Sequence, residues 1–166
     1  MAILAMRILG DPILRETCRP VEHFDATLER FASDLLAAMG HYKGVGVAAN
    51  QLGVGQRVFV YDDDGEPKWL VNPEITDLEG EETMDEGCLS LPDLYFPTRR
   101  ATRLQVVGQD MSGHPVEFVA EDFLARIMQH ETDHLNGLLY IDRLDEDVRR
   151  DAMREIRDLD VTASGA

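Results

Sequence analysis

Residues 123–137 read FLARIMQHETDHLNG and predict an amphipathic helix over 123–136. The apolar residues of this segment recur at helical spacing and share one face. These residues are Phe123, Leu124, Ile127, Met128 and Leu135. Gly137 follows at the position where a left-handed backbone ends many helices. We therefore expect a helix that ends near Asn136, and its polar residues are the chemically informative ones.

The same helix carries His130, Glu131 and His134, an instance of the H-E-x-x-H pattern. Residues four apart on a helix differ by about 400° in direction, so the two histidines project from nearly the same face and can bind one metal ion. Glu131 lies about 100° around from His130, where its carboxylate can act as a general base on a water without becoming a ligand. The alternative is a pair of histidines on a solvated helix face, which the pattern makes the weaker interpretation.

Cys88, in EGCLS at 86–90, is the obvious third ligand. A catalytic metal site generally takes three protein ligands and leaves a position for water, and no histidine follows His134. A lone cysteine is more often a small buried hydrophobe, but a polar, glycine-containing stretch between strands lets a thiolate face a metal. Cysteine with two histidines suits a soft or borderline ion such as Fe(II) or Zn(II). Cys18 has no partner motif and receives no role.

A glycine-rich segment, GVGVAANQ at 44–51, superficially matches the dinucleotide fingerprint G-x-G-x-x-G/A. That fingerprint needs a preceding strand, whereas the residues before 44 form an amphipathic helix that we expect to end near Gly40. Small residues instead allow close approach of the backbone to a ligand, and an extended backbone here can pair with a peptide substrate. Gln51 offers a neutral amide donor for an oxyanion. A tightly packed turn is the alternative.

In the rest of the chain, the sequence predicts one helix before a group of strands and another helix near the C-terminus. A helix begins at Asp25. Short β-branched or aromatic runs predict antiparallel strands at 57–61, 68–72, 103–107 and 115–119. The acidic residues at 62–65 resemble a calcium loop but lack carboxylates at its first and twelfth positions, so they predict a hairpin turn. A last helix begins at about Asp145, and we expect a frayed tail over about 161–166.

The composition of the chain favours a single globular domain and argues against nucleic-acid-binding, membrane-spanning and disulfide-rich proteins. The chain has 166 residues, 44% of them apolar, and neither repeats nor long linkers, so we expect one domain over 1–166. A formal charge of −16 argues against direct binding to nucleic acid or to an anionic membrane. No apolar run approaches the roughly 18 residues of a membrane span, and residues 1–9 lack a signal-peptide pattern, so we expect a cytoplasmic protein. Two cysteines exclude a disulfide framework.

The three motifs at 44–51, 86–90 and 129–134 stand in the order of the three signature blocks of the peptide deformylases and closely resemble them. The likeness extends from RILGDPIL at 7–14 to LNGLLYIDRL at 135–144. This resemblance implies an α+β fold, with small antiparallel sheets packed around a central helix that carries the H-E-x-x-H motif.

The resemblance also implies roles for individual residues. The metal ligands would be Cys88, His130 and His134, and Glu131 would be the general acid and base. The oxyanion donors would be the Gln51 side chain and the Leu89 backbone N–H. The methionine side chain would need an apolar pocket, and Val45, Phe123 and Ile127 are candidates because they lie close in sequence to the three motifs. Gly46 and Gly87 are further candidates for contact with the substrate.

The resemblance further implies N-formylmethionyl nascent peptides as substrates and formate as a product. Fe(II) would be the native ion, and Zn(II), Ni(II) or Co(II) could replace it. The stretch DLYFP at 93–97 departs from family versions that often carry a small or basic residue there. A transient ribosome contact is implied, but the terminal arginines alternate with acidic residues, which is typical of a solvated, ion-paired face.

Two other functions remain open at this point. The first is a metallopeptidase or amidase that acts on another acyl group or peptide bond. The second is a non-catalytic metal or peptide-binding protein. Glu131 and Gln51 argue against the second, because a closed structural site needs neither and would have a fourth protein ligand.

Overall fold

The computed structural model of the chain describes residues 3–165, with side chains described from residue 3 to residue 159. Its α-helices, strands and short 3₁₀ helices (η) are η1 (Pro12–Arg15), α1 (Ala26–Tyr42), β1 (Gly46–Ala48), η2 (Ala49–Leu52), β2 (Val58–Asp63), β3 (Glu66–Glu79), β4 (Glu82–Cys88), β5 (Leu91–Arg100), β6 (Arg103–Gln109), β7 (Pro115–Glu121), α2 (Asp122–Leu135), η3 (Tyr140–Arg143) and α3 (Glu146–Gly165).

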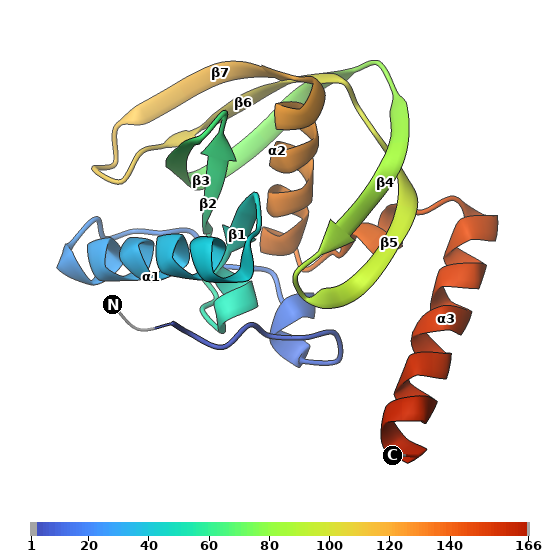
Figure 1. Cartoon of the computed structure of the whole chain (residues 1–166). Coiled ribbons are helices and arrows are strands. Elements are labelled where there is room, and N and C mark those ends of the chain that lie inside the picture. Colours follow the sequence, from blue (N-terminus) through green and yellow to red (C-terminus); the bar gives the residue numbers. More distant parts are fainter. Residues whose placement is uncertain (1–2, 166) are drawn as a thin grey trace.

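The strands form two antiparallel sheets. Five of them pair in the order β1-β2-β3-β6-β7, and β4 pairs with β5 in a separate hairpin. Helix α2 lies between the larger sheet and this hairpin (Figure 1), which confirms the predicted α+β fold around a central helix. The four predicted strands are confirmed as parts of β2, β3, β6 and β7. Strands β1, β4 and β5 were not predicted, and β4 reads ETMDEGC, which lacks an apolar alternation.

Side-chain alternation explains how helices cover both faces of the sheet at β2. Phe59 and Tyr61 belong to the core cluster that includes Met128 of α2. Val58 and Val60 point to the opposite face and belong to the cluster that includes Leu35 of α1. Strand β2 is therefore buried from both sides, and α2 is held rigidly against the sheet.

The predicted acidic turn is confirmed. Asp63 pairs with Glu66, and the two residues between them, Asp64 and Gly65, have φ values of 53° and 90°. Two consecutive residues with positive φ form the turn that suits the right-handed twist of a two-residue hairpin.

The predicted end of the first helix at Gly40 is wrong, because α1 continues to Tyr42 and is closed by Lys43 with φ 57°. The last turn is held by tertiary contacts: the Tyr42 hydroxyl accepts from Met6 N–H and donates to Leu4 O, both at 3.2 Å. These bonds explain why a glycine inside the pattern does not end the helix.

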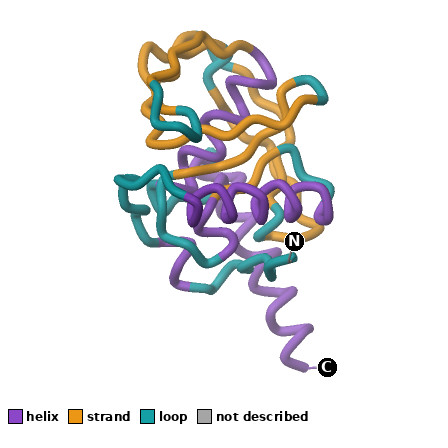
Figure 2. Tube along the Cα trace, turned by 90° about the vertical axis from the view of Figure 1, so that its left-hand side faces the viewer, coloured by secondary structure: helices purple, strands orange, loops and turns teal. Residues whose placement is uncertain are grey.

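Helix α3 extends away from the rest of the molecule in both views (Figures 1 and 2). Its first half is anchored by Ala152 and Ile156, which are buried among residues of β5 and η3. The helix continues to Gly165, and no proline or earlier glycine interrupts it. Fraying of this end stays a prediction, and Ala166 lies outside the described residues. Within residues 3–165, no helix is both long and apolar enough to cross a membrane.

Gly137 turns the chain from α2 back toward η3. Its φ is 74°, as predicted for a left-handed helix end. A Cβ atom at this position would lie 2.6 Å from the backbone oxygen of Arg15. Both the backbone conformation and the close approach therefore require glycine.

Replacing Gly137 with alanine is expected to destabilise the protein by at least about 1 kcal/mol more than the same replacement at Gly65. Both glycines have positive φ, but a Cβ at Gly65 meets no atom within 4 Å. Urea unfolding of the two variants measures the difference. Equal losses of stability would show that the contact with Arg15 adds nothing to the cost of the backbone conformation.

Candidate metal centre and active-site cleft

The three predicted metal ligands converge. Cys88 Sγ lies 3.3 Å from His134 Nε2, which lies 3.2 Å from His130 Nε2, and the three ligand atoms all lie within 4.8 Å of one another. Donors bound to one ion at about 2.0–2.3 Å in a tetrahedral arrangement are roughly 3.3–3.6 Å apart. The donor set and its spacing therefore fit one divalent ion bound by one thiolate and two imidazoles.

Glu86 orients the ring of His130. Its Oε1 lies 2.5 Å from His130 Nδ1, and it also accepts hydrogen bonds from Arg100 at 2.7 and 3.1 Å and from Arg126 at 2.8 Å. Burial opposes the charged form of Glu86, but the bonds from His130 and Arg100 hold its pKa well below the usual range. With Nδ1 engaged by a carboxylate, Nε2 is left facing the other candidate ligand atoms, 3.2 Å from His134 Nε2, an arrangement typical of metal-bound histidine.

Sequence reasoning did not assign a role to Glu86. A usable signal exists, because Glu86 lies only two residues before Cys88 and both belong to β4. A carboxylate beside a candidate ligand on a strand can engage the second nitrogen of a ligating histidine. The strand itself had to be recognised first.

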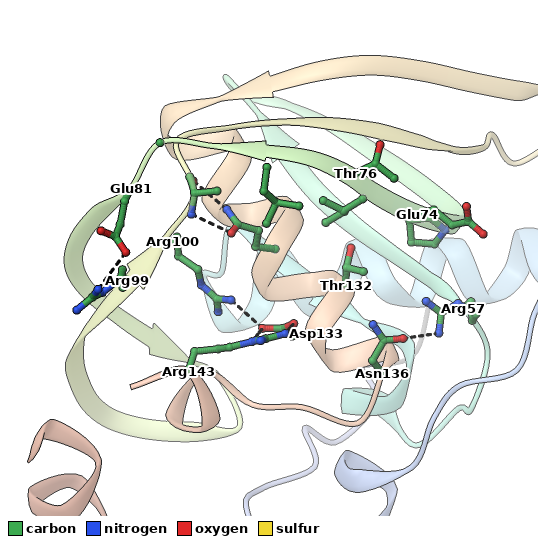
Figure 3. A pocket seen from close by; sticks show the side chains of 16 residues that line it. Arg57, Glu74, Thr76, Glu81, Arg99, Arg100, Thr132, Asp133, Asn136 and Arg143 are labelled. Atoms are coloured by element: carbon green, nitrogen blue, oxygen red, sulfur yellow. Dashed lines mark hydrogen bonds and ion pairs between the residues drawn. The ribbon is translucent and has the colours of Figure 1, made fainter. Parts of the chain in front are cut away.

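An ion-pair network is centred on Asp133, which lies on α2 three residues after His130 (Figure 3). Asp133 accepts from Arg100 at 2.7 Å and from Arg143 at 2.8 Å. This network borders a cavity of about 610 Å³ that is lined by residues of α2 and β3, among others. Arg100 thus connects Asp133 to Glu86, and through Glu86 to His130, so a buried chain of ion pairs supports the orientation of this candidate ligand.

His134 is held through its backbone. The Asn50 side-chain nitrogen donates to His134 O at 2.7 Å, which joins the glycine-rich motif to α2. His134 is 1% exposed, and its Nδ1 has no hydrogen-bond partner among the described residues. Its ring is therefore oriented by packing and not by a carboxylate.

Glu131 is buried beside the ligands. It is 3% exposed, and its Oε2 is without a hydrogen-bond partner in the described part of the chain. A Cβ at Gly46 would lie 2.6 Å from Glu131 Oε1, so glycine is required there for the carboxylate to fit. Burial raises the pKa of Glu131 to about 7. A carboxylate with this pKa can both accept and release a proton near neutral pH.

Gln51 is oriented by its own motif. Ala48 N–H donates to Gln51 Oε1 at 2.9 Å, so the amide nitrogen points the other way, 3.1 Å from Ser90 Oγ and 3.7 Å from Cys88 Sγ. Leu89 follows Cys88 directly and lines the same cleft. The oxyanion roles of the Gln51 amide and the Leu89 N–H stay predictions.

A cleft of about 580 Å³ brings the predicted site residues together. Its lining includes nearly all of them, namely Val45, Gly46, Gln51, Gly87, Cys88, Leu89, Phe123, Ile127, His130 and Glu131. His134 lies behind this surface. The cleft also includes Met6, Ile8 and Leu91, to which the sequence assigned no role, and Leu94 and Tyr95 from the stretch at 93–97.

The edge of the larger sheet borders this cleft. Strand β1 pairs with β2 on one side and is the terminal strand of the sheet, and Gly46 begins it. An extended peptide can add to such an edge through main-chain hydrogen bonds. The glycine-rich motif therefore provides an extended backbone beside Glu131, as the sequence predicted.

The chain is similar to known proteins along most of its length. A family model described as polypeptide deformylase matches residues 3–150. A peptide deformylase from Acidothermus cellulolyticus is 49% identical over 158 residues, covering 95% of this chain and 88% of that protein. The solved structure of the peptide deformylase from Thermus thermophilus superposes with a TM-score of 0.90 at 41% identity, and that from Legionella pneumophila with 0.88 at 38%. These two matches cover 94% and 98% of both chains, respectively.

Proposed function

The chain belongs to the peptide deformylase family, and from this membership we propose that Cys88, His130 and His134 hold the divalent ion of its active site. The enzyme is a metal-dependent hydrolase that removes the formyl group from formylmethionine at the start of new polypeptides. The observation that carries the site assignment is the convergence of three ligand atoms within 4.8 Å, next to the buried carboxylate of Glu131.

When bound, the ion would polarise the formyl carbonyl and raise the acidity of a water in the cleft. Glu131 accepts a proton from the water while the oxygen of the water forms a bond to the formyl carbon. The Gln51 amide and the Leu89 N–H stabilise the negative charge that develops on the formyl oxygen. As the carbon–nitrogen bond breaks, Glu131 gives the proton to the departing amine, and formate and a free methionine terminus are released.

The methionine side chain is proposed to occupy the apolar part of the cleft. Ile127 is buried, whereas Val45 and Phe123 are about half exposed, at 47% and 51%. Two exposed apolar residues beside a buried one offer a surface that a methionine side chain can cover. Gly46 and Gly87 are proposed to contact the substrate through their backbone, since the space of a side chain is taken by Glu131 at Gly46 and by Tyr95 at Gly87.

Fe(II) is proposed as the native ion, because one thiolate and two imidazoles form a donor set for soft or borderline metals. Zn(II), Ni(II) and Co(II) also bind to such donors and are proposed to replace Fe(II). We also propose that residues 1–166 act as one catalytic domain in the cytoplasm, where formylated polypeptides leave the ribosome. Any ribosome contact is transient, and α3 is not assigned to it.

The experiment that tests this function measures formate release from a formyl-Met tripeptide. The protein is prepared without oxygen and loaded with Fe(II), and an acetyl-Met tripeptide serves as the matched control. We expect formate from the formyl peptide and no turnover of the acetyl peptide. Comparable turnover of both would favour a broader amidase, and no turnover by folded, loaded protein would contradict the assignment.

A further inference from the structure

Tyr140 lies beneath the metal ligands, in a place that the sequence did not indicate. It begins η3, is 1% exposed, and belongs to a buried cluster against which Cys88 also packs. The turn at Gly137 returns the chain under α2 and so brings Tyr140 against His130, ten residues earlier in the sequence.

The ring of Tyr140 is nearly parallel to that of His130. Their centroids are 6.2 Å apart with an interplanar angle of 22°. The bond from His130 Nδ1 to Glu86 fixes one atom of the imidazole, but rotation about the last side-chain torsion of histidine has broad minima. A neighbouring aromatic face restricts that rotation, and with it the direction of the Nε2 lone pair, which lies in the ring plane.

The hydroxyl of Tyr140 makes a second connection. It donates to Leu94 O at 3.2 Å, and the ring is also nearly parallel to Phe96, at 6.2 Å and 26°. Leu94 and Phe96 belong to β5, which pairs with the strand that ends at Cys88. Tyr140 therefore contacts both elements that supply ligands, the hairpin with Cys88 and the helix with His130.

We propose that Tyr140 is a positioning residue of the metal centre: its ring fixes the plane of His130, and its hydroxyl fixes the hairpin that carries Cys88 relative to α2. This inference rests on the proposed assignment of His130 and Cys88 as ligands. The opposing interpretation is that Tyr140 only fills the core. The two interpretations differ in what a loss of the ring does to metal binding.

The test compares Tyr140→Met with Phe96→Met. Each variant replaces a buried aromatic side chain of the same cluster with a flexible one, but only the first removes a ring from His130. Zn(II) affinity is measured by chelator competition, and the ligand geometry by the absorption spectrum of the Co(II)-loaded protein. kcat and KM are measured separately on the formyl peptide.

We expect Tyr140→Met to weaken Zn(II) binding about 10–100-fold, in the range found when partners of metal-bound histidines are removed. The Co(II) bands should shift, and kcat should fall more than KM rises. Phe96→Met should keep Zn(II) affinity within about threefold of the parent protein, since it leaves the ring on His130 in place. Tyr140→Phe keeps the ring on His130 but loses the bond to Leu94 O, so its Zn(II) affinity should fall between those of Tyr140→Met and the parent protein. Equal effects of Tyr140→Met and Phe96→Met would overturn the proposal.

Cys88→Ser separates this inference from the site assignment on which it rests. If Cys88→Ser loses Zn(II) while Tyr140→Met retains it, only the role of Tyr140 is wrong. If Cys88→Ser binds as tightly as the parent protein, the ligand assignment itself is wrong. If Tyr140→Met does not fold, the contact is tested in the zinc-loaded parent protein by NMR. We expect a cross-peak between the ring protons of Tyr140 and His130, and its absence would overturn the proposed contact.

Discussion

Replacing Glu131 with glutamine is expected to lower kcat by about a thousandfold, within the range attributed to general acid–base catalysis, while the protein keeps one metal ion per chain. The amide has nearly the same shape as the carboxylate but cannot accept the proton from water or return it to the amine. The ligand atoms belong to Cys88, His130 and His134, so their convergence does not depend on Glu131. Formate release at saturating formyl peptide and metal analysis of the same samples measure the two quantities.

The folded state should tolerate this replacement. Glu131 is buried, and its Oε2 has no hydrogen-bond partner among the residues described, so its charged form is not compensated there. Glu117→Gln, at an exposed position on β7, is the matched control and should leave kcat unchanged. Retained turnover in Glu131→Gln, with metal bound, would remove Glu131 from the mechanism.

Replacing Arg100 with methionine is expected to destabilise the metal-free protein by about 3–5 kcal/mol, the cost of breaking a buried ion pair by removing one partner. The Arg100 side chain is 4% exposed and contacts Glu86 and Asp133. Arg126 and Arg143 remain bonded to these carboxylates, but each carboxylate loses a charged donor in a buried site.

Arg103→Met is the matched control, because Arg103 also pairs with two carboxylates but is about half exposed. Exposed pairs contribute about 0–1 kcal/mol, so this variant should unfold near the parent protein in urea. Arg100→Lys should fall between them, since lysine keeps the charge but cannot form the two-bond contact with Glu86. Losses within about 1 kcal/mol of each other for Arg100→Met and Arg103→Met would mean that burial adds nothing to the network's contribution.

Local patterns in the sequence predicted the elements that carry the chemistry. The helical spacing around residues 123–136 predicted α2, and the four-residue separation of His130 and His134 predicted that their rings share a face. The strands with β-branched alternation were also predicted. Strands β4 and β5 were not, because the first is mostly polar and owes its extended form to pairing with the second.

The sequence by itself determined the family and predicted the ligand types and the general base, because these follow from residue identity and from spacing within short motifs. Only the tertiary structure decided which distant residues surround the candidate ligands: Glu86 contacts His130, Arg100 contacts Glu86, and the Tyr140 ring lies nearly parallel to that of His130. These contacts join separate strands and helices across a buried core, and their partners are set by strand register and by the path of the turn at Gly137. Spacing along a chain specifies neighbours only within one helix or strand, so packing between elements had to select these partners.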